Sequence, residues 1–399
     1  MTETRTTEQP PARQGVLPPH HTKRVMKGNS AAAVAAKLCR VSLVTAYPIT
    51  PQTSIIEEIT SMIDHGEFDA TSVNMESEHS VFAALKGASL VGERVFTATS
   101  GQGLLYAHEV LHAIAHMRLP IVACNVGRPS FPWNIWADQT DSISQRDTGW
   151  VQYYCESSQE VLDTIIQSYK LAEKLQLPVM VVLDAFYLSH TSENVFLPDQ
   201  SLVDAFLPPA ENAGNRIDTN HPRAFGGLVG PNTYDDYNRL FWEDMNRVDE
   251  GTNVIGREFG EHFGRHYGAV EAVNIHQNTK KILVAMATIT TTVREVLDNY
   301  PDIGLLKIRL FKPFPKISIL EAIKPAGEDC AIITIDRNFT GDSEGALMQE
   351  MKRALYGNTG KVFGVYAGLG GRDVSVETIE KIINLDVDSP QTDEVTWIK

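Results

Sequence analysis

Cysteine is scarce in this chain of 399 residues, which contains only four. Cys39, Cys124, Cys155 and Cys330 are scattered singly, with no Cys-x-x-Cys pair among them. An iron–sulfur cluster needs closely spaced thiolates, so this chain cannot ligate one by itself, and we predict no metal site in it. Scattered cysteines are also untypical of the disulfide frameworks of secreted proteins and fit a reducing cytoplasm.

Basic residues and long apolar runs are lacking as well. The chain has 35 Lys and Arg against 50 Asp and Glu, a formal charge of -15, which repels nucleic acid and anionic lipid. Lys37, Arg40 and Asp184 interrupt or end the apolar stretches long before the roughly 20 residues that a spanning helix needs. We therefore expect a soluble protein that binds neither nucleic acid nor a membrane.

The first 24 residues also lack the apolar core of a secretory signal. They are rich in Thr, Pro, Gln and charge, a composition that predicts a flexible tail. Together with the cysteines, this indicates a cytoplasmic protein.

What the chain does have is an alternation of strand-length apolar runs and helix-length amphipathic stretches. This pattern is typical of a parallel sheet covered by helices, so the predicted fold class is α/β with doubly wound parallel sheets. We expect a first unit over residues 25–200, an extended connector over 201–277 that is rich in Pro, Asn, Asp and Gly, and a second unit over 278–399. The predicted strands are 43–46, 94–98, 121–126, 179–183, 282–287, 303–308 and 330–335.

Three loops follow predicted strands of the first unit, at residues 47–50, 99–103 and 127–136. In parallel sheets, ligands bind at the carboxyl ends of the strands, so we expect these loops to converge. In the first loop, prolines on both sides of Thr50 stiffen the backbone and present its hydroxyl in a fixed direction. The alternative is an ordinary turn in which Thr50 or Thr53 caps the next helix.

Two acidic residues, Glu76 and Glu78, lead into the apolar face of a predicted helix. A carboxyl buried at the edge of the sheet would have a raised pKa and could share a proton with a ring nitrogen. The alternative is that both residues only complement the helix dipole.

Arg128 lies in the third loop, among proline and aromatic residues. Its guanidinium matches a carboxylate with two parallel hydrogen bonds, as recognition of a 2-oxoacid requires. The alternative is that Arg128 only pairs with Asp138 or Asp141.

Several motifs in the same order carry a resemblance to a known family. They are Tyr-Pro-Ile-Thr-Pro at 47–51, Glu-Ser-Glu-His-Ser at 76–80, Thr-Ala-Thr-Ser-Gly-Gln-Gly-Leu at 97–104, Asp-Gln-Thr-Asp at 138–141, Arg-Asp-Thr-Gly-Trp at 146–150, Arg-Leu-Phe-Lys-Pro-Phe-Pro at 309–315 and Gly-Leu-Gly-Gly-Arg-Asp at 368–373. In these motifs the chain resembles the alpha subunit of the pyruvate:ferredoxin and 2-oxoacid:acceptor oxidoreductases, which depend on thiamine diphosphate. The resemblance covers nearly everything after residue 25.

The resemblance implies a pyrimidine-binding domain of the thiamine-diphosphate fold in the first unit and a transketolase-C-terminal-like α/β domain in the second. Glu78 would hydrogen-bond N1′ of the cofactor's aminopyrimidine, with Gly101 and Gln102 beside it. Thr50 would contact the 2-oxoacid and Arg128 would hold its carboxylate. The second unit, with its loop at 368–373, would chiefly hold the assembly together.

The resemblance also implies partner chains. A beta subunit would carry the diphosphate-binding domain and Mg²⁺, and this chain indeed lacks a Gly-Asp-Gly motif with a distant Asn. Gamma and ferredoxin-like delta subunits would carry [4Fe-4S] clusters. Electrons would pass to ferredoxin, or to NAD through a flavin subunit, and coenzyme A would accept the acyl group.

The loop at 127–136 departs from the pyruvate-specific pattern, because the surroundings of the arginine are aromatic. If this loop lines the pocket, Phe131, Trp133 or Trp136 could stack on a ring of the substrate, which favours an aromatic 2-oxoacid such as phenylglyoxylate. If they pack against a partner subunit, the pocket suits pyruvate. Two rival functions are a thiamine-dependent decarboxylase without clusters and a scaffold subunit without catalytic activity.

Overall fold

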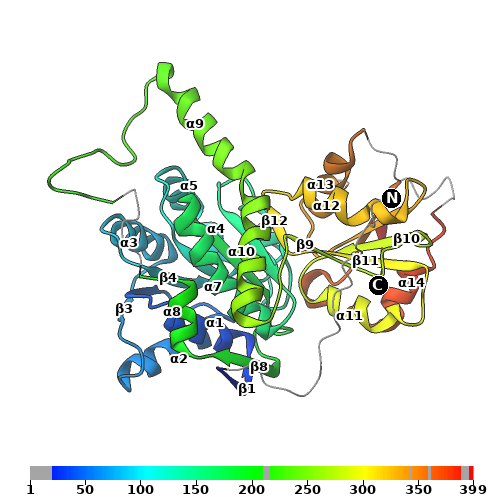
Figure 1. Ribbon diagram of the computed structural model, residues 1–399, viewed down its shortest axis with the longest axis horizontal. Helices are drawn as coiled ribbons and strands as arrows, with labels where there is room; N and C mark the ends of the chain where they lie inside the picture. The colour runs from blue at the N-terminus through cyan, green and yellow to red at the C-terminus, as the bar shows by residue number, and fades with distance from the viewer. Residues whose placement is uncertain (1–19, 210–215, 342–343, 358–360, 388–394, 399) are drawn as a thin grey trace, which may run out of the picture.

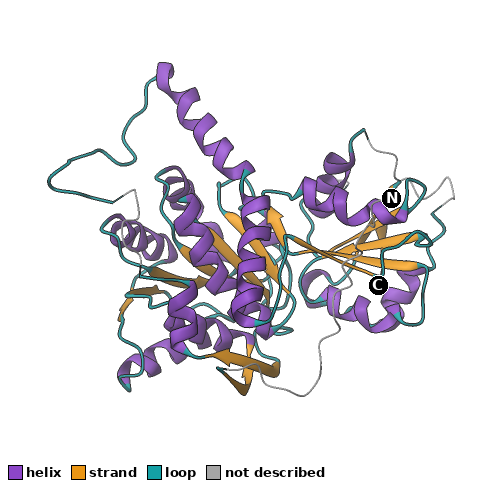
Figure 2. Ribbon diagram, in the orientation of Figure 1, coloured by secondary structure: helices purple, strands orange, loops and turns teal. Residues whose placement is uncertain are grey.

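The computed structural model describes residues 20–209, 216–341, 344–357, 361–387 and 395–398. These residues form two α/β domains side by side, each a twisted sheet with helices packed against it (Figures 1 and 2). Most of the predicted N-terminal tail, residues 1–19, lies outside the described residues. Its last residues correct the prediction, because strand β1 (His21–Lys27) already begins there and pairs antiparallel with β8 (Ser192–Pro198).

The first domain is built on a seven-stranded sheet of order β12-β6-β7-β5-β4-β2-β3. All its pairs are parallel except β12 with β6. The predicted strands of this domain are β2, β4, β5 and β7, whereas β3, β6 and β12 were not predicted. Its strands are β2 (Leu43–Ala46), β3 (Thr71–Asn74), β4 (Val95–Thr99), β5 (Val122–Gly127), β6 (Val151–Cys155), β7 (Val179–Asp184) and β12 (Leu310–Lys312).

Helices cover both faces of this sheet. The alanine-rich α1 is almost entirely buried, because small side chains on a strong helix former allow close packing, and it lies against α7. The helices are α1 (Gly28–Leu38), α2 (Thr53–Asp64), α3 (Glu78–Leu90), α4 (Gly101–Tyr106), α5 (His108–His116), α6 (Thr140–Ile143) and α7 (Ser158–Leu175).

The segment 201–277 contains regular structure between its irregular parts. Helix α10 packs on α7 and α8, whereas α9 has no buried residue and projects away from the body of the first domain (Figure 1). Strand β9 joins the second sheet. The elements are α8 (Gln200–Phe206), which begins one residue earlier, α9 (Pro231–Asn246), α10 (Val248–Phe263) and β9 (Val270–Val273).

The second domain has a six-stranded sheet of order β15-β14-β13-β10-β11-β9, parallel except for β9 at its edge. Strands β10, β11 and β13 are the three predicted from apolar runs. The further elements are β10 (Lys281–Ala285), α11 (Ile289–Leu297), β11 (Ile303–Ile308), α12 (Lys316–Ile323), η1 (Lys324–Ala326), β13 (Ala331–Asp336), α13 (Ala346–Leu355), β14 (Val362–Tyr366), η2 (Leu369–Gly371), α14 (Val376–Ile383) and β15 (Thr396–Trp397).

The two domains share a hydrophobic core. The chain leaves the second sheet at the end of β11 and enters the first sheet as β12, where Leu310 is paired with Tyr153. One buried cluster accordingly contains Tyr154 of the first sheet together with Phe311 and Leu347 of the second half of the chain. Because the domains bury apolar surface against each other, we expect their relative position to be well defined.

Candidate active site

The three predicted loops meet at one edge of the first sheet. Strands β5, β4 and β2 are neighbours and parallel, so their carboxyl ends lie side by side. The Arg128 guanidinium donates hydrogen bonds to the Thr50 carbonyl oxygen at 2.5 Å and to Oε1 of Gln102 at 2.8 Å. Nε2 of Gln102 in turn donates to the carbonyl oxygen of Ser130 at 2.5 Å. The predicted convergence of the loops is therefore confirmed.

Arg128 is a buried cation. The residue is only 6% exposed. Among the described residues, its guanidinium forms no ion pair with a carboxylate. Burial lowers the pKa of Arg128, while the charges of Asp141 and Glu78 act in the opposite direction. A buried cation is stable only when a counter-charge approaches it, so this geometry favours an anionic ligand. The alternative of a guanidinium ion pair with Asp138 or Asp141 is wrong.

Glu78 begins helix α3, after the neighbouring strand β3. The Ser77 side chain accepts a hydrogen bond from the backbone N–H of Ser80 and so caps the helix, which places Glu78 in its first turn. Glu78 is 8% exposed, and burial raises its pKa, although the nearby charge of Arg128 lowers it. Glu78 therefore lies at the N-terminal end of a helix, where it complements the dipole, and is also a buried carboxyl with a raised pKa.

Two glycines at the start of helix α4, which follows β4, allow the side chains of Arg128 and Glu78 to approach. A Cβ at Gly101 would lie 2.2 Å from Nε of Arg128, and Gly101 also has a positive φ of 50°. A Cβ at Gly103 would lie 2.3 Å from Oε1 of Glu78. Both distances are far below van der Waals contact, so the arginine and the carboxyl pack directly on glycine backbone.

Asp141 joins two of the loops, a role that the sequence analysis did not assign. Its Oδ2 accepts hydrogen bonds from the backbone N–H of Gly101 at 2.8 Å and of Arg128 at 3.2 Å. Its Oδ1 accepts from the N–H of Ser142 at 2.6 Å. Burial raises the pKa of Asp141 to about 6. The signal in the sequence was the Asp-Gln-Thr-Asp motif, but sequence alone does not say which backbone groups it meets.

Thr50 lies on a loop that other side chains hold in position. The amide of Asn29 donates to the carbonyl oxygen of Pro51 at 2.9 Å, and the amide of Gln52 donates to the carbonyl oxygen of Tyr47 at 2.9 Å. Thr50 itself is exposed at this edge. Helix α2 begins at Thr53 with no side-chain cap, so the capping alternative is wrong.

The aromatic residues of the third loop do not form one group. Phe131 and Trp133 are 73% and 60% exposed in the isolated chain. Trp136 instead packs against Phe186, with ring centroids 4.7 Å apart, and against the backbone of Gly371 in the second domain. Trp136 is itself 50% exposed, so the lining of the substrate pocket by these three residues stays a prediction.

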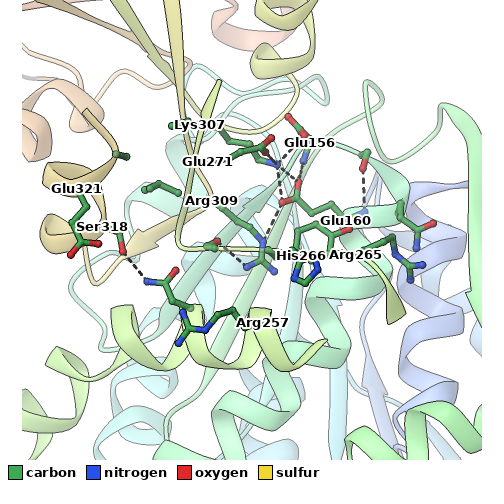
Figure 3. A pocket seen from close by; sticks show the side chains of 18 residues that line it. Glu156, Glu160, Arg257, Arg265, His266, Glu271, Lys307, Arg309, Ser318 and Glu321 are labelled. Carbon is green, nitrogen blue, oxygen red and sulfur yellow. Dashed lines mark hydrogen bonds and ion pairs between the residues drawn. The ribbon is translucent and has the colours of Figure 1, made fainter. Parts of the chain in front are cut away.

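A large cavity of about 920 Å³ lies elsewhere, between the two domains (Figure 3). Its charged side chains pair mainly with one another: Nζ of Lys307 is 2.9 Å from both Glu156 and Glu160, and Nε of Arg309 is 3.2 Å from Glu160. None of the predicted site residues lines this cavity. The candidate site is instead an open edge of the first sheet.

The described part of the chain contains no cluster of His, Cys, Asp and Glu that could hold a metal ion. The four cysteines are buried and unpaired, and burial raises the pKa of their thiols, which disfavours thiolate ligands. No helix among the described residues is both long and apolar enough to cross a membrane.

The first domain is a largely parallel sheet with a buried glutamate and a buried arginine at its carboxyl edge, and its match to a family model assigns it to the thiamine-diphosphate-binding α/β class. Residues 34–256 match the family described as pyruvate flavodoxin/ferredoxin oxidoreductase, thiamine-diphosphate-binding, and residues 279–379 match pyruvate:ferredoxin oxidoreductase core domain II. The chain belongs to this family and is a subunit of a 2-oxoacid oxidoreductase.

Two curated relatives match almost the whole chain. The ketoisovalerate oxidoreductase subunit VorA of Pyrococcus horikoshii is 44% identical over 387 residues, which cover 94% of this chain and 97% of the relative. The pyruvate synthase subunit PorA of Methanocaldococcus jannaschii is 42% identical, with the same coverage of 94% and 97%. Neither is named for an aromatic substrate, so the predicted aromatic preference gains no support from them.

A solved structure has the same fold. The 2-oxoglutarate:ferredoxin oxidoreductase from Magnetococcus marinus, with 2-oxoglutarate, coenzyme A and succinyl-CoA bound, superposes with a TM-score of 0.68 at 20% identity. The match covers 90% of this chain and 64% of the other, so the second protein has a substantial part without a counterpart here. At this identity the likeness shows the fold alone.

Proposed function

We propose that this chain is the alpha subunit that binds the pyrimidine end of thiamine diphosphate and the carboxylate of an aliphatic 2-oxoacid. The observation that carries the proposal is the pair of buried groups at one edge of the sheet. Glu78 has a raised pKa, and Arg128 has no carboxylate partner among the described residues. Glycine backbone at 101 and 103 leaves room for both.

The residues fit one end of the cofactor. A buried carboxyl with a raised pKa is the group that shares a proton with a pyrimidine nitrogen, and Glu78 meets this description. The described residues offer no cluster for Mg²⁺, and the chain lacks the diphosphate motif. We therefore assign the diphosphate and its metal to a beta subunit.

Each of the site residues has a separate role in this proposal. Thiamine diphosphate, when bound, would supply a carbon nucleophile for the 2-oxo group. Glu78 holds the proton at the pyrimidine N1′, beside Gly101 and Gln102. Arg128 orients the substrate carboxylate, and the exposed Thr50 contacts the 2-oxoacid. The loop contacts of Asn29, Gln52 and Asp141 hold these groups in place.

Electron transfer falls to partner chains. The four cysteines are buried and far apart in sequence, which does not suit a [4Fe-4S] cluster. As the family resemblance implies, gamma and delta subunits would carry the clusters and deliver electrons to ferredoxin, or to NAD through a flavin subunit. Coenzyme A, bound in the Magnetococcus marinus structure, would accept the acyl group here also.

The relatives support an aliphatic substrate. They are named for ketoisovalerate and for pyruvate, both small aliphatic 2-oxoacids.

The test is turnover of the whole native complex with coenzyme A, measured as reduction of a viologen dye. Pyruvate, 2-oxoisovalerate, 2-oxoglutarate and phenylglyoxylate are supplied in turn. We expect reduction with one of the two aliphatic monocarboxylates. A clear preference for phenylglyoxylate contradicts the aliphatic assignment, and decarboxylation by a complex without iron and sulfide favours the decarboxylase instead.

A further inference from the structure

The turn that contains Asp138 and Asp141 connects the candidate site to the second domain. Asp141 accepts hydrogen bonds from the N–H groups of Gly101 and Arg128, as described above. Asp138, three residues earlier, accepts from the N–H of Gly370 at 2.9 Å through Oδ2 and from the N–H of Thr140 at 2.8 Å through Oδ1. One short turn therefore holds the active-site loops on one side and the glycine loop of the second domain on the other.

Further contacts attach the arginine loop to the second domain. The Asn134 side chain donates to the carbonyl oxygen of Gly370 at 3.0 Å, and the N–H of Gln139 donates to the carbonyl oxygen of Arg337 at 3.0 Å. The hydroxyl of Tyr187 donates to the carbonyl oxygen of Gly371 at 2.9 Å. The loop at 127–136 thus rests on backbone that belongs to the other half of the chain.

The glycines in the second domain are required for this close approach. Gly370 and Gly371 have φ values of 59° and 82°, a region that favours glycine. A Cβ at Gly371 would lie 2.1 Å from Cβ of Trp136. A side chain at 371 therefore has to displace either the end of the loop that carries Arg128 or the backbone of residues 370–372 that supports it.

A buried ion pair holds the part of the second domain that contacts Gln139. Arg337, whose carbonyl oxygen accepts from Gln139, forms an ion pair with Asp184 at 2.7 Å, and both side chains are almost fully buried. Asp184 also accepts from the N–H of Thr288 at 3.1 Å. Because removing either partner would leave a buried charge unpaired, the backbone at Arg337 that accepts from Gln139 is held in place.

We propose that the second domain, through residues 368–372, positions Arg128 for the 2-oxoacid carboxylate, and that Asp138 and Asp141 are positioning residues in this connection. The inference rests on the proposed function of Arg128. Neither carboxylate bonds the guanidinium, so both act through backbone. The second domain thereby sets substrate affinity in addition to holding the assembly together.

The experiment compares Gly371→Ala with Gly327→Ala in the assembled holoenzyme. Gly327 is a matched control, because it lies in the same domain with a φ of 79° and has nothing within 4 Å of an added Cβ. We expect Gly371→Ala to raise the KM for the 2-oxoacid about tenfold or more, since a displaced guanidinium loses charge-assisted hydrogen bonds that contribute to binding of the carboxylate. The kcat, the KM for coenzyme A and the affinity for thiamine diphosphate are expected to stay near wild type in both variants.

Asp138 gives an independent arm. Asp138→Ala removes the acceptor for Gly370 and should raise the same KM, while Asp138→Asn keeps one amide oxygen as acceptor and should restore part of the affinity. A merely structural role would lower the yield of assembled complex without this selective change in KM. An unchanged KM for the 2-oxoacid in Asp138→Ala overturns the inference. This result is decisive even if the Gly371→Ala variant does not assemble.

Arg128→Lys separates failure of the inference from failure of the proposed function. If Arg128→Lys raises the KM but Gly371→Ala and Asp138→Ala do not, only the positioning role is wrong. If Arg128→Lys leaves the KM unchanged, the carboxylate assignment itself is wrong, and the inference falls with it.

Discussion

Gly103 and Glu78 lie so close that position 103 has no room for a side chain: a Cβ there would lie 2.3 Å from Oε1 of Glu78 and 2.7 Å from its Cδ. The glycine lies in α4, after β4, and the glutamate begins α3, after β3. The contact explains why a glycine-rich run stands at the end of a buried strand in this chain. It keeps the carboxyl close to backbone and away from solvent.

Gly103→Ala is therefore expected to displace the Glu78 carboxyl and to lower kcat of the assembled enzyme about a hundredfold, as small misplacements of reacting groups do. Stopped-flow or steady-state viologen reduction measures this loss. Gly87→Ala is the control, because Gly87 also lies in a helix, has no positive φ and has nothing within 4 Å of an added Cβ. Wild-type kcat in Gly103→Ala would contradict the importance of this contact.

Glu78→Gln keeps the size of the side chain but cannot hold an acidic proton. We expect kcat to fall about a hundredfold or more, in the range typical for loss of a proton-transfer group. Glu76→Gln serves as the control, since Glu76 is exposed to solvent. Equal activity of the two variants would remove Glu78 from the mechanism and would revive the scaffold alternative.

Arg128→Lys replaces a planar fork with a single ammonium group. The variant loses the parallel pair of hydrogen bonds to a carboxylate and also cannot reproduce the bonds to Thr50 and Gln102. We expect the KM for the 2-oxoacid to rise about tenfold to a hundredfold while the KM for coenzyme A stays unchanged. Arg239→Lys, on the exposed helix α9, should leave both constants at wild-type values.

The buried ion pair between Asp184 and Arg337 is expected to contribute to the stability of the fold. Asp184→Asn leaves the buried Arg337 guanidinium without its counter-charge, so we expect a loss of about 3–5 kcal/mol in the free energy of unfolding. Urea denaturation followed by circular dichroism measures it. Glu243→Gln, which breaks an exposed pair with Arg239, should cost less than about 1 kcal/mol.

Two buried carboxyls predict a pH dependence of stability. Burial raises the pKa of Asp141 and of Asp336 from 3.8 to about 6. Between about pH 4 and pH 6 the folded state then binds more protons than the unfolded state, so the free energy of unfolding falls as the pH rises through this window.

Asp336→Asn removes one of these groups and should make the fall shallower. Urea denaturation at several pH values between about 4.5 and 6.5 tests this expectation. Asp302→Asn is the control, because a hydrogen bond from Lys280 lowers the pKa of that exposed carboxyl. A wild-type slope in Asp336→Asn would show that burial of Asp336 does not govern this dependence.

Much of the first sheet could be predicted from residue pattern alone. The runs that became β2, β4, β5 and β7 are apolar over strand length and are bounded by turns, and parallel strands bring their following loops to one edge. For this reason the sequence alone predicts that Thr50, Gln102 and Arg128 meet. Strands β3 and β6 were not predicted. Strand β3 has polar and exposed residues, which give no apolar run.

By itself, the sequence determined the α/β class, the separation into two sheets, the loops that carry Thr50 and Arg128 and the helix that begins near Glu78, because these follow from local periodicity and strand order. Only the tertiary structure decided which groups these residues contact. Asp141 bonds backbone N–H groups, Trp136 packs on the second domain, and β12 crosses into the first sheet. These contacts join residues up to about 235 positions apart, and local pattern carries no information about such pairs.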